Sequence, residues 1–164
     1  MITPAESQHL IAINDIYNQA VEEGLRTAHT ESVSLNHRRE WFEKHQEDTH
    51  PVFVYTDNDT TIGWLSVSPY RSDRQALDDI VEISYYVDYD HHNKGIATKL
   101  LEHGLHFCRK INYRMAVAIL VSGNEPSIAL LKKFNFTEGG RIPDALLFGD
   151  EYRDHVYMYK KFSH

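Results

Sequence analysis

The chain has 164 residues, 41% of them hydrophobic and 25% charged, as in an ordinary water-soluble domain with a substantial core. Its formal net charge of −7 and the absence of any Lys/Arg cluster beyond short pairs argue against nucleic acid as a partner, because an acidic surface repels phosphate backbones. A single cysteine, Cys108, excludes an internal disulfide, and neither a membrane-spanning apolar run nor a secretory signal is present, so we expect one cytoplasmic domain over residues 1–164 with no membrane partner.

The first part of the chain predicts two helices. After Pro4, apolar residues recur at spacings of three and four, which indicates a helix with one apolar face: Leu10, Ile13, Tyr17, Ala20 and Val21. Gly24 is suited to end it. A second, more polar helix is expected over residues 35–45, with Trp41 and Phe42 turned inward.

Strand patterns follow. Residues 52–55 and 61–67 are expected to form a hairpin, with turn residues at 57–59, and residues 81–87 a further strand after a polar loop at 69–79. A helix should open at Gly95 or Ile96, and the nearly continuous apolar run 115–121 indicates a strand covered on both faces. A helix over residues 126–134 and one or two closing strands complete a mixed α/β domain.

The segment from Tyr86 to Leu101 is the most informative, because a strand runs through a tight loop into a helix N-terminus. The first N–H groups of a helix have no internal partners and the helix dipole adds positive charge there, so this geometry suits a phosphate-bearing ligand. The segment lacks the Lys-Ser/Thr pair of a P-loop and the three glycines of a dinucleotide fingerprint. On the residues alone, an ordinary connection and a phosphate site are both open.

Residues 92–97, His-Asn-Lys-Gly-Ile-Ala, resemble the acetyl-CoA pyrophosphate loop of the GCN5-related N-acetyltransferase (GNAT) superfamily, Gln/Arg-x-x-Gly-x-Gly/Ala, with His92 in place of Gln or Arg. Further likeness to its phosphinothricin N-acetyltransferase-like branch extends over nearly the whole chain: Ile16-Tyr17-Asn18, Thr27-Ala28, Arg38-Arg39-Glu40-Trp41-Phe42, Gly63-Trp64, Val81-Glu82, Asn124-Glu125-Pro126-Ser127 and Phe134-Asn135-Phe136. The resemblance implies the GNAT acyl-CoA N-acyltransferase fold, a central twisted mixed sheet flanked by about four helices.

Glu82 stands where this branch has its proposed general base. Strand alternation places it on one face with Ser84 and Tyr86, opposite Val81 and Ile83. On sequence alone a solvated edge position is the simpler interpretation. The resemblance implies instead a partly buried carboxylate that deprotonates the incoming ammonium group for direct attack on the thioester, with a backbone N–H of residues 85–87 stabilising the oxyanion.

Contacts with acetyl-CoA are implied for Tyr85, Tyr86, Val87, His92, Asn93, Lys94, Gly95, Ile96, Ala97, Thr98, Asn124 and Ser127. We expect His92 to weaken cofactor binding without abolishing it, because such loops hold phosphate mainly through backbone N–H groups. Asn124 is also a natural helix cap, and both roles can coexist. Leu131 stands where many members have a tyrosine that protonates the leaving thiolate, so the thiolate leaves without an acid or a nearby tyrosine serves.

Cys108 lies on the apolar face of its helix, so a buried structural thiol is favoured over a nucleophile. The His103/His106 pair is most simply a solvated face, and we predict no metal. The amine pocket is expected from residues 26–31, the loop 70–79 and the tail near 152–155, where Asp73, Asp78, Asp79, Arg71 and Arg74 offer charges.

The resulting prediction is an acetyl-CoA-dependent N-acetyltransferase for the primary amine of a small amino-acid-like molecule: phosphinothricin, methionine sulfone or methionine sulfoximine. A homodimer is common in this branch. Two alternatives stay open: an acetyltransferase for another amine, such as a polyamine or a peptide N-terminus, and a non-catalytic CoA-binding sensor.

Overall fold

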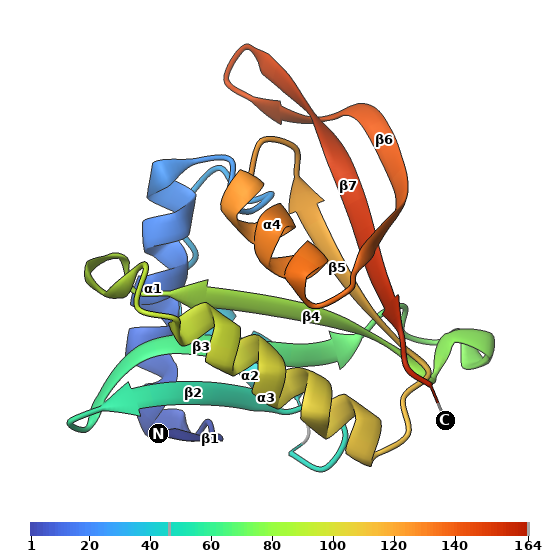
Figure 1. Ribbon diagram of the computed structural model, residues 1–164. Helices are drawn as coiled ribbons and strands as arrows, with labels where there is room; N and C mark the ends of the chain where they lie inside the picture. The colour runs from blue at the N-terminus through green and yellow to red at the C-terminus, as the bar shows by residue number, and fades with distance from the viewer. Residues whose placement is uncertain (46, 164) are drawn as a thin grey trace.

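A mixed sheet of seven strands, in the order β1-β2-β3-β4-β5-β7-β6, runs through the part of the chain that the computed structural model describes, residues 1–45 and 47–163 (Figure 1). The strands are β1 (Ile2–Pro4), β2 (Val52–Asp57), β3 (Thr60–Pro69), β4 (Ile80–Val87), β5 (Met115–Val121), β6 (Thr137–Phe148) and β7 (Glu151–Lys161). The helices are α1 (Leu10–Glu23), α2 (Leu35–Glu43), α3 (Ile96–Lys110) and α4 (Glu125–Lys133). Neighbouring strands are antiparallel except β4 and β5, which are parallel, so the expected mixed α/β class is confirmed.

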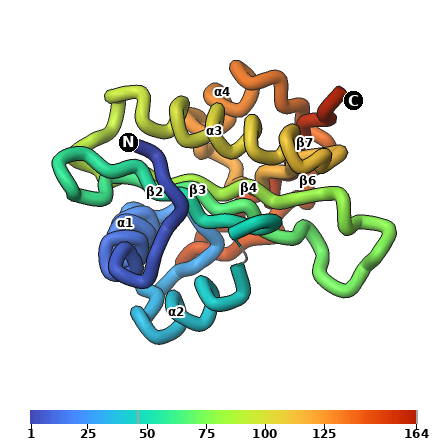
Figure 2. Tube along the Cα trace, turned by 90° about the horizontal axis from the view of Figure 1, so that it is seen from below, coloured from blue at the N-terminus to red at the C-terminus, as the bar shows by residue number. Residues whose placement is uncertain are grey.

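The helices cover both faces of the sheet. Figure 2 shows α1 and α2 on one side and α3 and α4 on the other. Each side has its own apolar core, one around Ile13 and Trp64 and the other around Leu65 and Leu100. Trp64 and Leu65 are neighbours in β3 and enter opposite cores, as the alternation of a strand requires.

Close packing of α3 against β3 fixes where the start of α3 lies. A Cβ atom added to Gly104 would stand 2.7 Å from Leu65 Cδ2, so any larger residue here would force the buried Leu65 side chain to move. The helix begins at Ile96, directly after Gly95, whose positive φ of 76° favours glycine. The N-terminus of α3 is thereby held beside the end of β4.

The structure departs from the predicted elements mainly near the chain ends. The short strand β1 was not predicted, because three residues paired at a sheet edge show no periodicity. The closing strands are longer than expected, with 12 residues in β6 and 11 in β7, and they include the polar residues around 144–154. Among the described helices none is long and apolar enough to cross a membrane.

Candidate active site

Strands β4 and β5 pair at one end and separate at the other. Within the described residues, β4 pairs with β5 only from Ile80 to Glu82, although the two strands continue to Val87 and Val121. Figure 1 shows them diverging, with α4 lying over the gap. The Asp88 N–H donates to the Ile62 carbonyl on the β3 side, so by alternation the backbone groups of Tyr85 and Val87 face the gap. The gap therefore exposes a free strand edge in the interior of the sheet.

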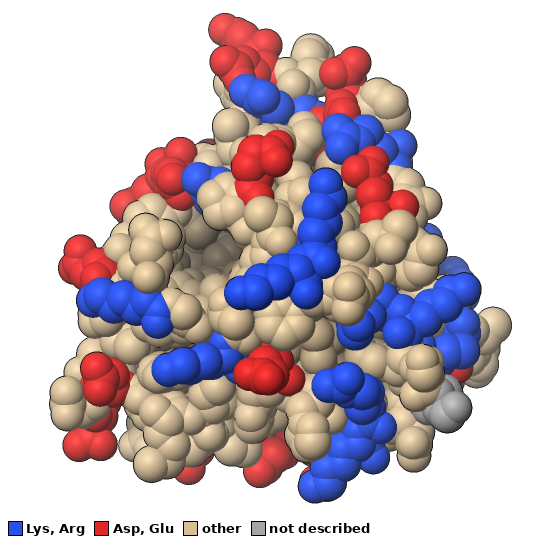
Figure 3. Space-filling view, viewed as in Figure 1, with Lys and Arg blue, Asp and Glu red and all other residues tan. Residues whose placement is uncertain are grey.

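A cavity of about 440 Å³ opens at this gap on the side of α3 and α4. The space-filling view shows it as a hollow in uncharged surface with Lys and Arg side chains beside it (Figure 3). Most of the residues implied to contact acetyl-CoA line it: Tyr85, Tyr86, Val87, His92, Asn93, Gly95, Ile96, Ala97, Thr98, Asn124 and Ser127. Lys94 does not, because its ammonium group donates instead to the Asp90 carbonyl at 3.0 Å.

The N-terminus of α3 presents free donors to this cavity. Gly95, the N-cap residue, provides no side-chain cap, and the Lys99 N–H donates to the Gly95 carbonyl at 3.1 Å. The N–H groups of the three preceding residues, 96–98, therefore lie within the first turn, where no intrahelical acceptor exists. These donors and the positive end of the helix dipole suit a pyrophosphate.

His92 ties the loop to the end of β4. Its Nε2 donates to the Val87 carbonyl at 2.9 Å, and its ring lies 4.4 Å from that of Tyr89. The Tyr89 hydroxyl in turn donates to the Glu23 carboxylate of α1. The side chain at this position thus holds the loop against the end of β4.

A polar bridge spans the cavity between α1 and α4. The Arg26 guanidinium contacts Glu23 at 2.8 Å and donates to Asn124 Oδ1 at 2.8 Å, and this hydrogen bonding lowers the pKa of Glu23 to about 2. Asn124 occupies the N-cap position of α4 without a side-chain capping bond, so the capping interpretation is wrong.

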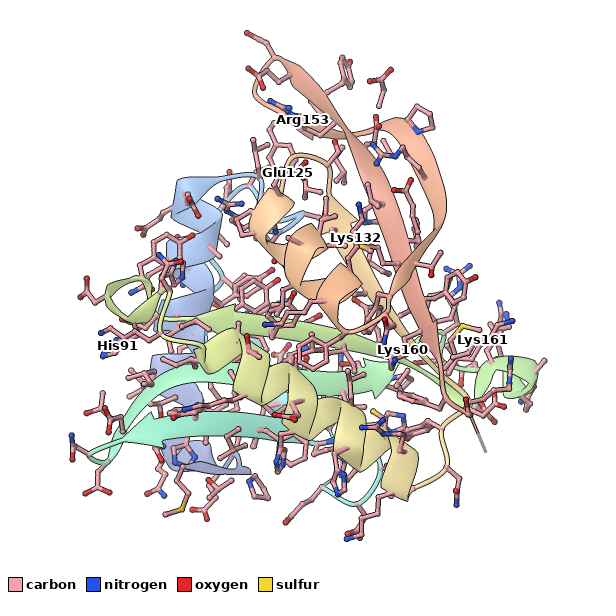
Figure 4. All side chains as sticks on the ribbon, in the orientation of Figure 1. His91, Glu125, Lys132, Arg153, Lys160 and Lys161 are labelled. Carbon is pink, nitrogen blue, oxygen red and sulfur yellow. The ribbon has the colours of Figure 1, made fainter. Side chains whose placement is uncertain are left out.

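Figure 4 shows His91, before α3, and Glu125, at the start of α4, on opposite sides of the opening.

Tyr85 extends into the same cavity as Leu131, the residue that offers no proton. Leu131 is fully buried in α4, whereas the Tyr85 hydroxyl is buried with no hydrogen-bond partner among the described residues. Burial raises the pKa of Tyr85 to about 12. This phenol therefore remains a protonated donor at neutral pH.

A second cavity, of about 450 Å³, lies on the side of α1 and α2. Glu82, Ser84 and Tyr86 line it together, which confirms that they share one face of β4. Burial raises the pKa of Glu82, whose carboxylate forms no hydrogen bond or ion pair with another described residue. Five residues line both cavities, one in the segment after α1 and four in the diverging strands β4 and β5: Arg26, Ser84, Tyr86, Ile119 and Leu120.

The expected amine pocket is partly corrected. Residues 26–29 and His155 line the second cavity, but no residue of the loop 70–79 does. That loop joins β3 to the start of β4, at the end where β4 still pairs with β5, and Asp79 forms an ion pair with Arg114 at 2.8 Å. Aromatic side chains form much of the lining instead: Tyr17, Trp41, Trp64 and Tyr86. None of the four was expected in the amine pocket from the sequence.

The remaining reactive side chains lie elsewhere. Cys108 is fully buried in the core, and burial raises the pKa of its thiol to about 12, which suits a structural residue. His103 is half-buried against Phe53, with ring centroids 4.5 Å apart, and His106 is exposed. The described residues contain no group of three His, Cys, Asp or Glu side chains arranged to hold a metal ion.

Comparison with known proteins decides the family. The sequence pattern of the acetyltransferase (GNAT) family matches residues 13–136. The chain belongs to the GNAT acetyltransferase family. It is 33% identical over 140 residues, 85% of each chain, to YwnH of Bacillus subtilis (strain 168), which is provisionally named a phosphinothricin acetyltransferase.

Another relative and a solved structure of an acetyltransferase support the same family and fold. An L-methionine sulfoximine/L-methionine sulfone acetyltransferase of Pseudomonas paraeruginosa is 30% identical over 129 residues, 78% of this chain and 74% of that one. The structure of yncA from Salmonella typhimurium, solved with its cofactor acetyl-CoA, superposes with a TM-score of 0.93 at 28% identity and covers 100% of this chain and 94% of that one. The expected GNAT fold is therefore confirmed.

This GNAT domain departs from the family pattern at His92 and Leu131. At the first position, His92 donates a hydrogen bond to the Val87 carbonyl and so attaches the loop to β4. At the second, Leu131 offers no proton, and the cavity is lined by the hydroxyl residues Tyr85 and Ser127 beside it. Sequence reasoning missed Arg26 as a partner of Asn124, because a contact between residues 98 positions apart leaves no local pattern.

Proposed function

We propose that the protein transfers the acetyl group of acetyl-CoA to the primary amine of a small amino-acid-like substrate of the phosphinothricin, methionine sulfone or methionine sulfoximine type. The observation that carries the proposal is the meeting of two cavities at the gap between β4 and β5. One presents helix N–H donors and a free strand edge, and the other contains the Glu82 carboxylate.

The chain's own groups fit acetyl-CoA in the first cavity. The pyrophosphate would be held by the N–H groups of residues 96–98. The pantetheine arm would pair at the edge of β4 with the backbone of Tyr85 and the Val87 N–H, because the Val87 carbonyl accepts from His92. Asn124, the N-cap residue of α4, and Ser127 within α4 would contact the arm from the other side. Nothing in this arrangement requires a metal ion.

The substrate amine would approach from the second cavity. Glu82 accepts a proton from the ammonium group, directly or through water, and the free amine attacks the thioester carbon. A backbone N–H of residues 85–87 stabilises the oxyanion, and its collapse forms the amide and breaks the C–S bond. The Tyr85 hydroxyl donates a hydrogen bond to the departing thiolate, which takes up the second proton that the nitrogen loses and becomes free CoA, and Glu82 releases the first proton to solvent.

The proposal includes a cytoplasmic homodimer. Strands β6 and β7 extend beyond the rest of the sheet (Figure 1). Their outer part exposes large apolar side chains, including the cross-strand pair Leu147 and Tyr152, at 52% and 62% exposure. Exposed apolar surface of this kind favours association with a second subunit.

Thiol release from acetyl-CoA tests the proposed activity. The purified protein is incubated with acetyl-CoA and a panel containing phosphinothricin, methionine sulfone, a polyamine and a peptide. We expect amine-dependent thiol release with the amino-acid-like substrates. Release only with the polyamine or the peptide would overturn the substrate class, and binding of acetyl-CoA without any release would favour a sensor.

A further inference from the structure

Arg38 is a buried cation without an acidic partner. Only 4% of its surface is exposed, and no described carboxylate forms an ion pair with it. Its guanidinium lies over the rings of Tyr17 and Trp41, with its central carbon 4.4 and 4.6 Å from their centroids. Its one side-chain hydrogen bond among the described residues is a long one, from Nε to Asn14 Oδ1 at 3.4 Å.

This environment is unfavourable for the positive charge of Arg38 when the cavity holds no ligand. Burial lowers the pKa of Arg38, yet a guanidinium stays protonated in proteins, so its charge is held in a poorly solvated position. Aromatic faces recover part of the lost hydration. A buried charge normally has a counter-ion. Since Arg38 lines the second cavity, a ligand in that cavity can supply one.

Trp64 provides an independent indication in the same place. Its indole N–H is buried and has no acceptor among the described residues, although Trp64 lines the same cavity. The Arg38 guanidinium lies 5.6 Å from the Trp64 ring centroid. Buried N–H donors usually have partners, so a second unmatched donor beside the cation points to an acceptor from outside the chain.

We infer that Arg38 and Trp64 form an oxyanion subsite for the amine substrate, which binds its carboxylate or the acidic group at its other end. The inference rests on the proposed function and identifies how its substrate class is selected. With Glu82 acidic and Arg38 basic in one cavity, the site complements a substrate that carries an ammonium group and an anion. A polyamine would place a second cation near Arg38 and is disfavoured.

Tryptophan fluorescence can report on this subsite directly. Both tryptophans of the chain, Trp41 and Trp64, lie beside Arg38, with ring centroids 5.5 Å apart. Titrations are carried out in the presence of CoA, so that no acetyl transfer occurs. The probes are phosphinothricin, its decarboxylated amine, which keeps the phosphinate, and 2-aminobutanoate, which keeps the carboxylate.

We expect Arg38→Met to weaken binding about 10- to 100-fold for probes that carry the recognised anion and to leave the third probe within about two-fold. Loss with phosphinothricin and 2-aminobutanoate identifies the carboxylate, and loss with phosphinothricin and the decarboxylated amine identifies the phosphinate. Equal weakening of all three probes, or no response of the wild-type protein at millimolar concentrations, would overturn the inference.

Two further variants separate recognition from folding. Arg39→Met removes the exposed neighbouring cation on the same helix and should leave all three affinities unchanged. Trp64→Phe keeps an aromatic ring but removes the N–H donor, and should weaken only the two probes that carry the anion recognised by Arg38, by about 3- to 10-fold, with Trp41 as the reporter. If the wild-type protein binds the probes but releases no thiol from acetyl-CoA, the proposed function fails while the subsite stands.

Discussion

The two cavities that meet at the gap between β4 and β5 are built in different ways. The one beside α3 and α4 relies on backbone groups: the first turn of α3 and the free edge of β4. The one beside α1 and α2 relies on side chains from five elements: Tyr17 of α1, Arg38 of α2, Trp64 of β3, Glu82 of β4 and His155 of β7. Backbone donors remain when a side chain is replaced. Ligand binding in the first cavity should therefore tolerate substitution of its lining residues better than binding in the second.

The largest effect is expected at the side-chain cavity, for Glu82→Gln. Loss of the base should lower kcat by about 10²- to 10⁴-fold. The KM for acetyl-CoA should stay within a few-fold, because the backbone cavity is unchanged. Steady-state kinetics measure both, with Glu102→Gln on the exposed face of α3 as the control. Wild-type turnover in Glu82→Gln would remove Glu82 from the mechanism.

The same variant should be more stable than the wild-type protein at neutral pH. Burial raises the pKa of Glu82 in the folded state, so its ionisation costs folding free energy. The cost is absent below the unfolded-state pKa and complete above the folded-state pKa. Thermal unfolding at pH 7 should therefore give a higher Tm for Glu82→Gln, and an unchanged Tm would contradict the burial of this carboxylate.

In the cavity beside α3 and α4, the largest effect is expected from a substitution that distorts the backbone. Gly95→Ala places a Cβ at φ 76°, which costs about 1–2 kcal/mol, and distorts the first turn of α3. We expect the KM for acetyl-CoA to rise about 10-fold, the factor that 1.4 kcal/mol represents. Gly149→Ala in the β6–β7 turn, at φ 60°, is the matched control, and should lose similar stability with no change in KM.

Tyr85→Phe should separate catalysis from stability. Removing the buried, unpartnered hydroxyl should keep or raise the Tm, because no hydrogen bond is lost. Without a donor for the thiolate, kcat should fall about 3- to 10-fold. Unchanged kcat in single-turnover measurements would show that the thiolate leaves unaided.

The smallest effect is expected at His92. His92→Gln restores the residue that is common in the family, and phosphate contacts remain with the backbone of α3. The Kd for acetyl-CoA should change by less than about three-fold, the effect of one modest hydrogen bond. A change of more than ten-fold, measured by isothermal titration, would show that this side chain binds the cofactor directly.

The same contrast explains what could be predicted from the sequence. The backbone cavity comes from one continuous segment, residues 86–101, whose strand, loop and helix signals are local. The face of Glu82 also followed from alternation within β4. The side-chain cavity depends on how α1 and α2 pack over β3, so the stacking of Arg38 on Tyr17 and Trp41 could not be inferred from spacing. The loop 70–79 was wrongly expected in the amine pocket, because its charges do not reveal at which end of β4 the strand separates from β5.

The pH dependence of kcat/KM for the amine, in the wild-type protein and in Glu82→Gln, tests the central claim most directly. Only ionised Glu82 accepts a proton, and burial raises its pKa above the ordinary value of 4.5. The wild-type rate should therefore fall as the pH drops through that raised pKa, and this inflection should be absent from the residual activity of Glu82→Gln. An inflection that persists unchanged in the variant would contradict the assignment of Glu82 as the base.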